Sequence, residues 1–209
     1  MQPAHLVQQL PRGRHNLPRG EVVATQTKRM LEAMARAVAK NGYARTTVAD
    51  VLAGARVSRE TFYQQFANKE ECFLAAYDLS VQQLLGRMAT AAAESSESPL
   101  GRFDQALSAY LEFMIHEPAM ARVFLIDVYA GGPRVLARRR KVQERFVERI
   151  CEMLQAETPP ERFQCEALVA SISSLVTVRL ADNDVGGLRR LRAPILRIAK
   201  LLAPEAALV

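Results

Sequence analysis

The sequence predicts an all-α fold, with a small N-terminal helical domain followed by a C-terminal helical bundle, and two observations support this. Along most of the 209 residues, apolar side chains recur three to four positions apart, as on one face of a helix, and no alternating strand pattern persists. Residues 46–69, TTVADVLAGARVSRETFYQQFANK, contain two short apolar-patterned segments joined by a tight turn. Such a pair is typical of a helix-turn-helix, whose second helix lies in the major groove of DNA. We therefore expect an N-terminal three-helix DNA-binding domain.

The first short helix carries its own start signal. Thr47 can accept hydrogen bonds from the free backbone N–H groups, and Asp50, three residues later, can reach back to complete a capping box. Val48, Val51 and Leu52 then form a single apolar face.

The second short helix has an inner and an outer side. Ser58 is its expected N-cap, and Phe62 and Phe66, four positions apart, should point inward. Asn68 then starts the next helix and places Lys69 at its N-terminus, where backbone N–H groups also favour a phosphate. The outer side is rich in groups that suit base edges and phosphate oxygens, namely Ser58, Arg59, Glu60, Thr61, Tyr63, Gln64 and Gln65.

These residues closely resemble the DNA-binding domain of TetR-family transcriptional regulators, in which a helix precedes a pattern like TTVxDIAxxAGVSxxTFYxHFxxKExL. The resemblance runs from about Arg19 to Tyr77. It implies that Tyr63 and Lys69 contact phosphates and that Thr47 anchors the start of the preceding helix to the DNA backbone. The side chains that it places at base edges are Arg59, Glu60 and Gln64.

One position departs from the family pattern. Where the family usually has Gly in the turn, this chain has Arg56, and the nearest glycine, Gly54, lies two positions earlier. If the turn needs a positive φ here, a residue with a Cβ costs roughly 1 kcal/mol. Either the turn is built differently, or Arg56 accepts the strain and adds a cation near the DNA, which is the interpretation we favour. The complete set of expected DNA contacts is Thr47, Arg56, Ser58, Arg59, Glu60, Thr61, Tyr63, Gln64, Gln65 and Lys69.

Three segments are expected along the chain: a flexible basic arm at 1–18, the DNA-binding domain at 19–77, and an effector-binding and dimerisation domain at 78–209. In the first twenty residues Arg12, Arg14 and Arg19 have no acidic partner, and the stretch PRGRHNLPRG is too rich in Pro and Gly for a continuous helix. The arm either follows the DNA backbone or a minor groove, or is an ordinary disordered terminus, and the sequence leaves both open.

The charge distribution agrees with a polyanionic partner. The formal net charge is +6, and residues 1–79 hold 11 Lys and Arg against 7 Asp and Glu, whereas residues 80–209 hold 17 against 15. The relative surplus of cations therefore lies in the segment expected to meet DNA, although many unrelated proteins are also basic.

The other expected helices are separated by Pro and Gly signals at Asn41-Gly42, Pro99, Pro118, Gly131-Gly132-Pro133, Pro159-Pro160 and Gly186-Gly187. The helix at about 69–94 should link the two domains, so that a shift in it would carry information between them. The expected helices are about 20–40, 69–94, 100–116, 118–129, 134–156, 160–181 and 187–202.

In the family that the chain resembles, the C-terminal domain dimerises through its last two helices. We expect a two-fold homodimer, because half-sites one DNA turn apart require one. The alternative is that both helices are simply intramolecular core. The expected interface residues are Phe163, Ala167, Ala170, Ser171, Ser174, Leu175, Val178, Leu191, Ile195 and Ile198.

The family resemblance also implies an effector pocket, for a small and largely apolar molecule. Aromatic and methionine side chains on the middle helices could line it, although such a stripe is more often plain core. Arg179 is either a carboxylate-binding side chain or a surface cation. The candidate pocket residues are Phe103, Tyr110, Phe113, Met114, Met120, Phe124, Tyr129 and Arg179.

Two other groups of residues are given structural interpretations. The run from Arg138 to Lys141 spreads around a helix at 100° per residue and is interpreted as a solvated face rather than a nucleic-acid patch. Cys72, Cys151 and Cys165 have no metal or disulfide spacing and are expected to be buried small hydrophobes. A redox pair of Cys151 with Cys165 is the weaker alternative.

Little in the sequence supports an enzyme. It contains no Gly-rich phosphate loop after a strand, no G-x-S-x-G motif and no clustered metal ligands, so neither catalysis nor a cofactor nor a metal is expected. A helical protein–protein adaptor without DNA binding is the main alternative function. No apolar run approaches the ~20 residues of a membrane span and no apolar leader segment is present, so a cytoplasmic protein that contacts no membrane is expected.

Overall fold

The structure, a computed structural model, describes residues 19–94 and 98–202, and within these ranges the chain is helical without a strand. The predicted all-α fold is thus confirmed. The elements in chain order are α1 (Arg19–Asn41), α2 (Val48–Ala55), α3 (Arg59–Gln65), α4 (Lys69–Ala93), α5 (Pro99–His116), α6 (Pro118–Leu125), the 3₁₀ helix η1 (Asp127–Ala130), α7 (Pro133–Leu154), α8 (Pro159–Ala181), α9 (Val185–Arg190) and α10 (Arg192–Leu202).

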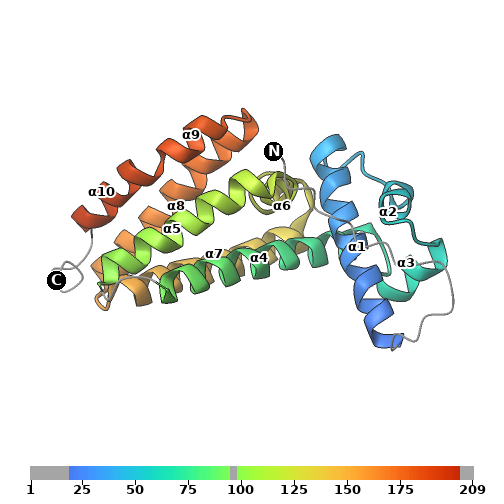
Figure 1. Ribbon diagram of the computed structural model, residues 1–209, viewed down its shortest axis with the longest axis horizontal. Coiled ribbons are helices and arrows are strands. Elements are labelled where there is room, and N and C mark those ends of the chain that lie inside the picture. Colours follow the sequence, from blue (N-terminus) through green and yellow to red (C-terminus); the bar gives the residue numbers. More distant parts are fainter. Residues whose placement is uncertain (1–18, 95–97, 203–209) are drawn as a thin grey trace.

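Helices α1, α2 and α3 form one end of an elongated molecule (Figure 1). Met30, Met34 and Val38, spaced by four positions on α1, are fully buried, so one side of that helix covers the helix-turn-helix and the base of α4. The arm expected at 1–18, with Arg12 and Arg14, lies outside the described residues, and Arg19 is the first residue of α1.

Helix α4 connects the two parts of the molecule without a break. It starts beside α3 and runs along the bundle with α5 and α7 (Figure 1). Phe73 and Tyr77, near its start, and Leu84, about two turns beyond Tyr77, are fully buried. Buried residues of α4 therefore lie both at the end that packs on α1 and inside the bundle.

Two predicted helices differ from expectation, one by ending early and one by being divided. The helix expected at 118–129 stops at Leu125 and tightens into η1 ahead of Gly131 and Gly132. The helix expected at 187–202 is divided into α9 and α10, because Pro194 lacks the N–H that would continue the hydrogen-bond ladder to Arg190.

Gly186 and Gly187 were predicted to separate two helices, and this prediction was wrong because both lie inside α9. The break comes earlier, where Asn183 adopts φ 53°. Asp184 accepts a hydrogen bond from the N–H of Gly187 at 2.7 Å. A Cβ on Gly187 would lie 1.9 Å from an Asp184 carboxylate oxygen, so this N-cap requires glycine.

The three cysteines are free and buried, as predicted. Burial raises the pKa of Cys72 to about 12 and, together with the neighbouring Cys151 thiol, that of Cys165 to about 12. The reactive thiolate is therefore strongly disfavoured at neutral pH, which weighs against the redox pair.

Among the described helices, α8 is long and apolar enough to cross a membrane by length and composition, contrary to the expectation that no segment approaches this. Only 28% of its most apolar stretch is buried within the chain. The core helix of a soluble protein passes the same test, and so the finding is weak support for a membrane contact.

Candidate DNA interface and effector cavity

The start of α2 is fixed by the predicted capping box. The N–H of Thr47 donates to Asp50 Oδ2 at 2.8 Å, and the N–H of Asp50 donates to Thr47 Oγ1 at 3.3 Å. The hydrogen bonds from the hydroxyl and the N–H of Thr47 lower the pKa of Asp50. Thr47 is exposed, and its position beside the entrance to α2 suits the phosphate contact that the family resemblance implies.

The turn between α2 and α3 uses Arg56 in the left-handed conformation, with φ 54° and ψ 49°. The chain therefore builds the usual positive-φ turn with a residue that carries a Cβ, which is the alternative favoured from the sequence. Arg29 on α1 supports the turn because its guanidinium donates to the carbonyl of Ala55. Arg56 itself is exposed on the same end of the molecule as α3.

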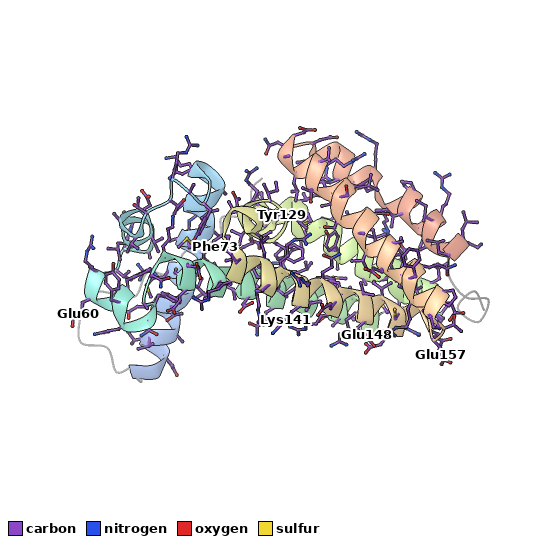
Figure 2. All side chains as sticks on the ribbon, turned by 180° about the vertical axis from the view of Figure 1, so that it is seen from behind. Glu60, Phe73, Tyr129, Lys141, Glu148 and Glu157 are labelled. Atoms are coloured by element: carbon purple, nitrogen blue, oxygen red, sulfur yellow. The ribbon has the colours of Figure 1, made fainter. Side chains whose placement is uncertain are left out.

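Helix α3 is held from inside and open on the outside. Phe62 is fully buried and Phe66 nearly so, whereas Tyr63 is 48% exposed. Ser58 caps the helix by accepting from the N–H of Thr61 at 3.0 Å. Glu60 marks the outer tip of the molecule in Figure 2. The exposed members of the expected contact set are Thr47, Arg56, Ser58, Arg59, Glu60, Tyr63 and Gln64.

Three expected contacts have other partners. Gln65 is half-buried against α1, where its Oε1 lies 3.5 Å from Thr27 Oγ1, so it does not share the outer face. Thr61 is also half-buried, and its hydroxyl lies 2.9 Å from that of Ser58. Lys69 donates to the carbonyl of Tyr43 at 3.0 Å and lies 4.4 Å from the centre of the Tyr43 ring, which leaves part of the ammonium group for a phosphate.

A cavity of about 70 Å³ lies in the bundle between α4, α5, α6, α7 and α8. Phe103, Tyr110 and Phe124 line it, as expected from the sequence. The sequence did not indicate the other lining residues, most of which come from helices that are distant in the chain. These are Tyr77, Met88, Leu107, Leu125, Arg139, Val142, Gln143, Phe146, Ile150, Val169, Ile172 and Ser173.

The five other candidate pocket residues lie elsewhere. Phe113, Met114 and Met120 are buried in the core and do not line the cavity. Tyr129 is 56% exposed, at the junction between α6 and α7 (Figure 2). Arg179 donates to the carbonyl of Leu175 at 3.0 Å, on its own helix.

The basic run on α7 is only partly the solvated face that was expected. Arg138 pairs with Asp78 on α4, with 2.7 Å between Nε and Oδ1, and Arg139 lines the cavity. Arg140 and Lys141 are exposed, as expected. The spread of these cations around the helix is what directs two of them toward neighbouring elements.

The predicted dimer residues on α8 share one exposed stripe, from Phe163, 69% exposed, to Val178, 54% exposed. Ala167, Ala170, Ser171 and Ser174 lie between them and are exposed, and Leu175 is half-buried. On the last helices, Ile198 is 42% exposed. The assignment of Leu191 and Ile195 to an interface was wrong, because they are buried where this segment packs on α5 and α8.

Residues 30–76 match the family model of bacterial regulatory proteins, tetR family. This range begins inside α1 and ends inside α4, and so contains the whole helix-turn-helix. The helix-turn-helix segment of this chain is therefore of the TetR type. No curated protein sequence matches it.

Solved structures are similar to this chain in fold beyond the matched range. The fatty acid degradation regulator FadR from Bacillus halodurans is 15% identical, with a TM-score of 0.74, over 86% of this chain and 95% of that chain. FadR from Bacillus subtilis is 16% identical, with a TM-score of 0.73, over 84% and 97%. A TetR-like transcriptional regulator from Rhodococcus sp. RHA1 is 18% identical, with a TM-score of 0.68, over 90% and 100%. The C-terminal bundle is therefore also similar to those of TetR-family regulators.

Proposed function

We propose that this TetR-family transcriptional regulator acts as a homodimeric repressor that binds a palindromic operator and is released by a small, largely apolar effector. The observation that carries the proposal is the outer face of α3. There Arg59, Glu60, Tyr63 and Gln64 stand exposed on a short helix that buried phenylalanines hold from behind. Donors and acceptors presented by a rigid helix are what direct readout of base edges requires.

We assign base readout to Glu60 and Gln64 and phosphate contact to Tyr63, Arg56 and Thr47. Gln64 Nε2 lies 3.4 Å from Glu60 Oε1, so the two side chains are neighbours that could share adjacent bases. The supporting cations at Arg56 and Lys69 flank α3 on either side. Phosphate contacts from such side chains would fix the helix in the groove without selecting sequence.

We assign the dimer interface to α8 and the exposed side of α10, and a two-fold dimer would require a palindromic operator. The stripe from Phe163 to Val178 is apolar or small and unusually exposed, and Ile198 and Leu201, which is 84% exposed, add to it on α10. A two-fold pair of such faces would present two α3 helices at the spacing of one DNA turn, about 34 Å. We assign DNA binding to residues 19–77, and effector binding and dimerisation to residues 78–209. The protein acts in the cytoplasm, where DNA is accessible.

The cavity supports control by a ligand. FadR from Bacillus subtilis is in complex with stearoyl-CoA, so a protein of similar fold accommodates a long apolar molecule. At about 70 Å³ the cavity holds only a few molecules the size of water, and a larger effector must move the helices around it. Because α4 is one of those helices and also packs on α1 of the DNA-binding domain, its movement would change the half-site spacing. To switch operator occupancy nearly completely, the effector must favour the released form by about 5.5 kcal/mol.

Selection from random duplexes tests the proposal. We expect the purified chain to enrich a palindrome with half-sites one turn apart and Gln64→Ala to enrich a different one. A helical adaptor, the alternative function, should enrich no sequence, and that outcome would overturn the proposal.

A further inference from the structure

Three of the polar residues that line the cavity, Tyr77, Arg139 and Gln143, lie at one end of it. Tyr77 lies near the start of α4, and Arg139 and Gln143 lie near the start of α7. The two helices run in parallel, because Glu70 and Asp78 on α4 pair in the same order with Arg134 and Arg138 on α7.

Eleven residues beyond the polar end, at about 16 Å along each helix axis, the lining is Met88 and Ile150. Phe103, from the start of α5, closes the same far end. The cavity is therefore elongated, polar where it approaches the DNA-binding domain and apolar where it enters the bundle.

Tyr77 contributes a hydroxyl with no hydrogen-bond partner. The side chain is fully buried, and Oη has no partner among the described residues. Burial raises the pKa of Tyr77, and the nearby Arg139 only partly opposes this, so the hydroxyl stays protonated and can donate. An unsatisfied buried donor costs free energy that an acceptor supplied by a ligand would recover.

Arg139 contributes a guanidinium that forms no ion pair with a carboxylate of the described residues. Its guanidinium donates to Gln143 Oε1 at 3.1 Å and lies 4.6 Å from the centre of the Tyr129 ring. In the part of the chain that the structure describes, no ion pair engages it, whereas the adjacent Arg138 has Asp78. None of the described lining residues is acidic, and Arg139 alone among them is charged.

We infer that the cavity takes an elongated amphiphile with one anionic end, whose oxygen atoms accept a hydrogen bond from Tyr77 Oη and pair with the Arg139 guanidinium. The apolar body of this ligand extends toward Met88 and Ile150. The inference rests on the proposed function in taking the cavity as the effector site, and it adds the charge of the ligand and the residues that select it. A carboxylate and the phosphates of a coenzyme A thioester share this chemistry, and the experiment separates them.

Direct titration without DNA tests the charge of the ligand. Dodecanoate, dodecan-1-ol and dodecyltrimethylammonium have the same chain and differ in the charge of the head, and dodecanoyl-CoA carries its anionic groups further from the chain. We expect dodecanoate to bind about tenfold or more tightly than the alcohol, the value for one charge-assisted hydrogen bond. The cation should bind weakest. Equal affinities for the acid and the alcohol, or a preference for the cation, would overturn the inference. Tight binding of the thioester alone would show that the anionic group recognised is a phosphate of coenzyme A rather than a carboxylate.

Two variants and a matched control test which residues select the anionic end of the ligand. Tyr77→Phe should leave thermal stability unchanged or higher, because it removes an unsatisfied hydroxyl, and should weaken dodecanoate several-fold. Arg139→Gln should abolish the preference for the acid over the alcohol, while Arg140→Gln, an exposed neighbour, should preserve it. If Arg139→Gln kept the preference, the inference would be wrong even if the protein binds its operator. If charge selection is seen but dodecanoate leaves operator binding intact, the ligand site stands and the proposed regulatory function fails.

Discussion

Arg138 on α7 donates to Asp78 on α4, with 2.7 Å between Nε and Oδ1. The hydrogen bond and the charge of Asp78 raise the pKa of Arg138. Arg134 and Glu70 form a second link at 2.9 Å, next to the first residue of α4. Arg139, adjacent to Arg138, lines the cavity, so α7 carries both part of the cavity wall and the ion pairs to α4, the helix that packs on α1.

Arg138→Gln tests whether these links transmit ligand binding. Both partners are more than a third exposed, so the pair itself should stabilise the fold by only about 0.2–1 kcal/mol. We expect the ligand affinity of the free protein to be nearly unchanged and the ligand concentration for half-release of DNA to rise several-fold. A cycle with Asp78→Asn measures the coupling, and additive effects of the two changes would exclude it.

Arg56→Gly should have opposite effects on stability and on DNA binding. Glycine removes roughly 1 kcal/mol of left-handed strain, so the free energy of unfolding in urea should rise. Loss of the cation should weaken every DNA sequence alike and reduce the salt dependence of binding. Arg56→Lys keeps the charge and serves as the control; if Gly and Lys bound DNA equally well, Arg56 would have no phosphate contact.

Tyr63→Phe and Gln64→Ala should have different effects on DNA binding, the first on overall affinity and the second on sequence preference. Removing the Tyr63 hydroxyl should weaken all duplexes similarly, since phosphates carry no sequence information. Removing the Gln64 amide should cost about 1–3 kcal/mol on the preferred operator and less on others. Competition binding with matched and mismatched duplexes distinguishes them, and identical profiles for the two variants would refute the division of roles.

Phe163→Glu should separate the subunits. A carboxylate placed at the most exposed end of the α8 stripe would face its symmetry mate, and burying it there is unfavourable. Sedimentation at micromolar concentration should change from a dimer to the 23.2 kDa chain. Leu136→Glu, on α7 and 38% exposed, is the control that should remain dimeric. If the wild-type protein is already a monomer, the proposed homodimer is wrong and a palindromic operator is no longer expected.

The raised pKa of Asp127 should make the stability of the fold fall as pH rises, which is the opposite of the usual effect of a carboxylate. Burial raises its pKa, and Arg122, 3.8 Å away, opposes the shift. The folded state therefore holds the proton more tightly than the unfolded state, whose pKa is near 3.8, and stability falls as pH rises from that value through the folded pKa. Asp127→Asn should remove this loss, so its stability relative to wild type should increase over that window. Urea unfolding at several pH values measures this, and a relative stability that decreases would reverse the assignment.

The DNA-binding end was largely predictable because its signals are local. Thr47 with Asp50 and Ser58 with Thr61 cap helices within three residues, and the alternation of Phe62 with Tyr63 assigns inner and outer sides. The left-handed Arg56 was the favoured of two alternatives, because the family that the segment resembles usually has Gly at this position. Gln65 was misassigned because the contact with Thr27 spans 38 residues.

The cavity was less predictable because packing over long sequence distances decides it. Tyr77 and Arg139 meet only after α4 and α7 are aligned, and nothing local marks either as a lining residue. Of the aromatic residues expected on α5 and α6, Phe103, Tyr110 and Phe124 line the cavity, whereas Phe113 and Met114 on α5 turn to the core. The interface assignment failed at Leu191 and Ile195 for the same reason, since periodicity identifies an apolar face but not what covers it.

The most direct test of the central claim is the anisotropy of a labelled palindromic duplex, obtained by selection with this chain, titrated with protein and then with dodecanoate. We expect two chains to bind each duplex and the ligand to release them, at a concentration that Tyr77→Phe raises and Arg140→Gln does not. A duplex that stays bound when the cavity is saturated with ligand would contradict it.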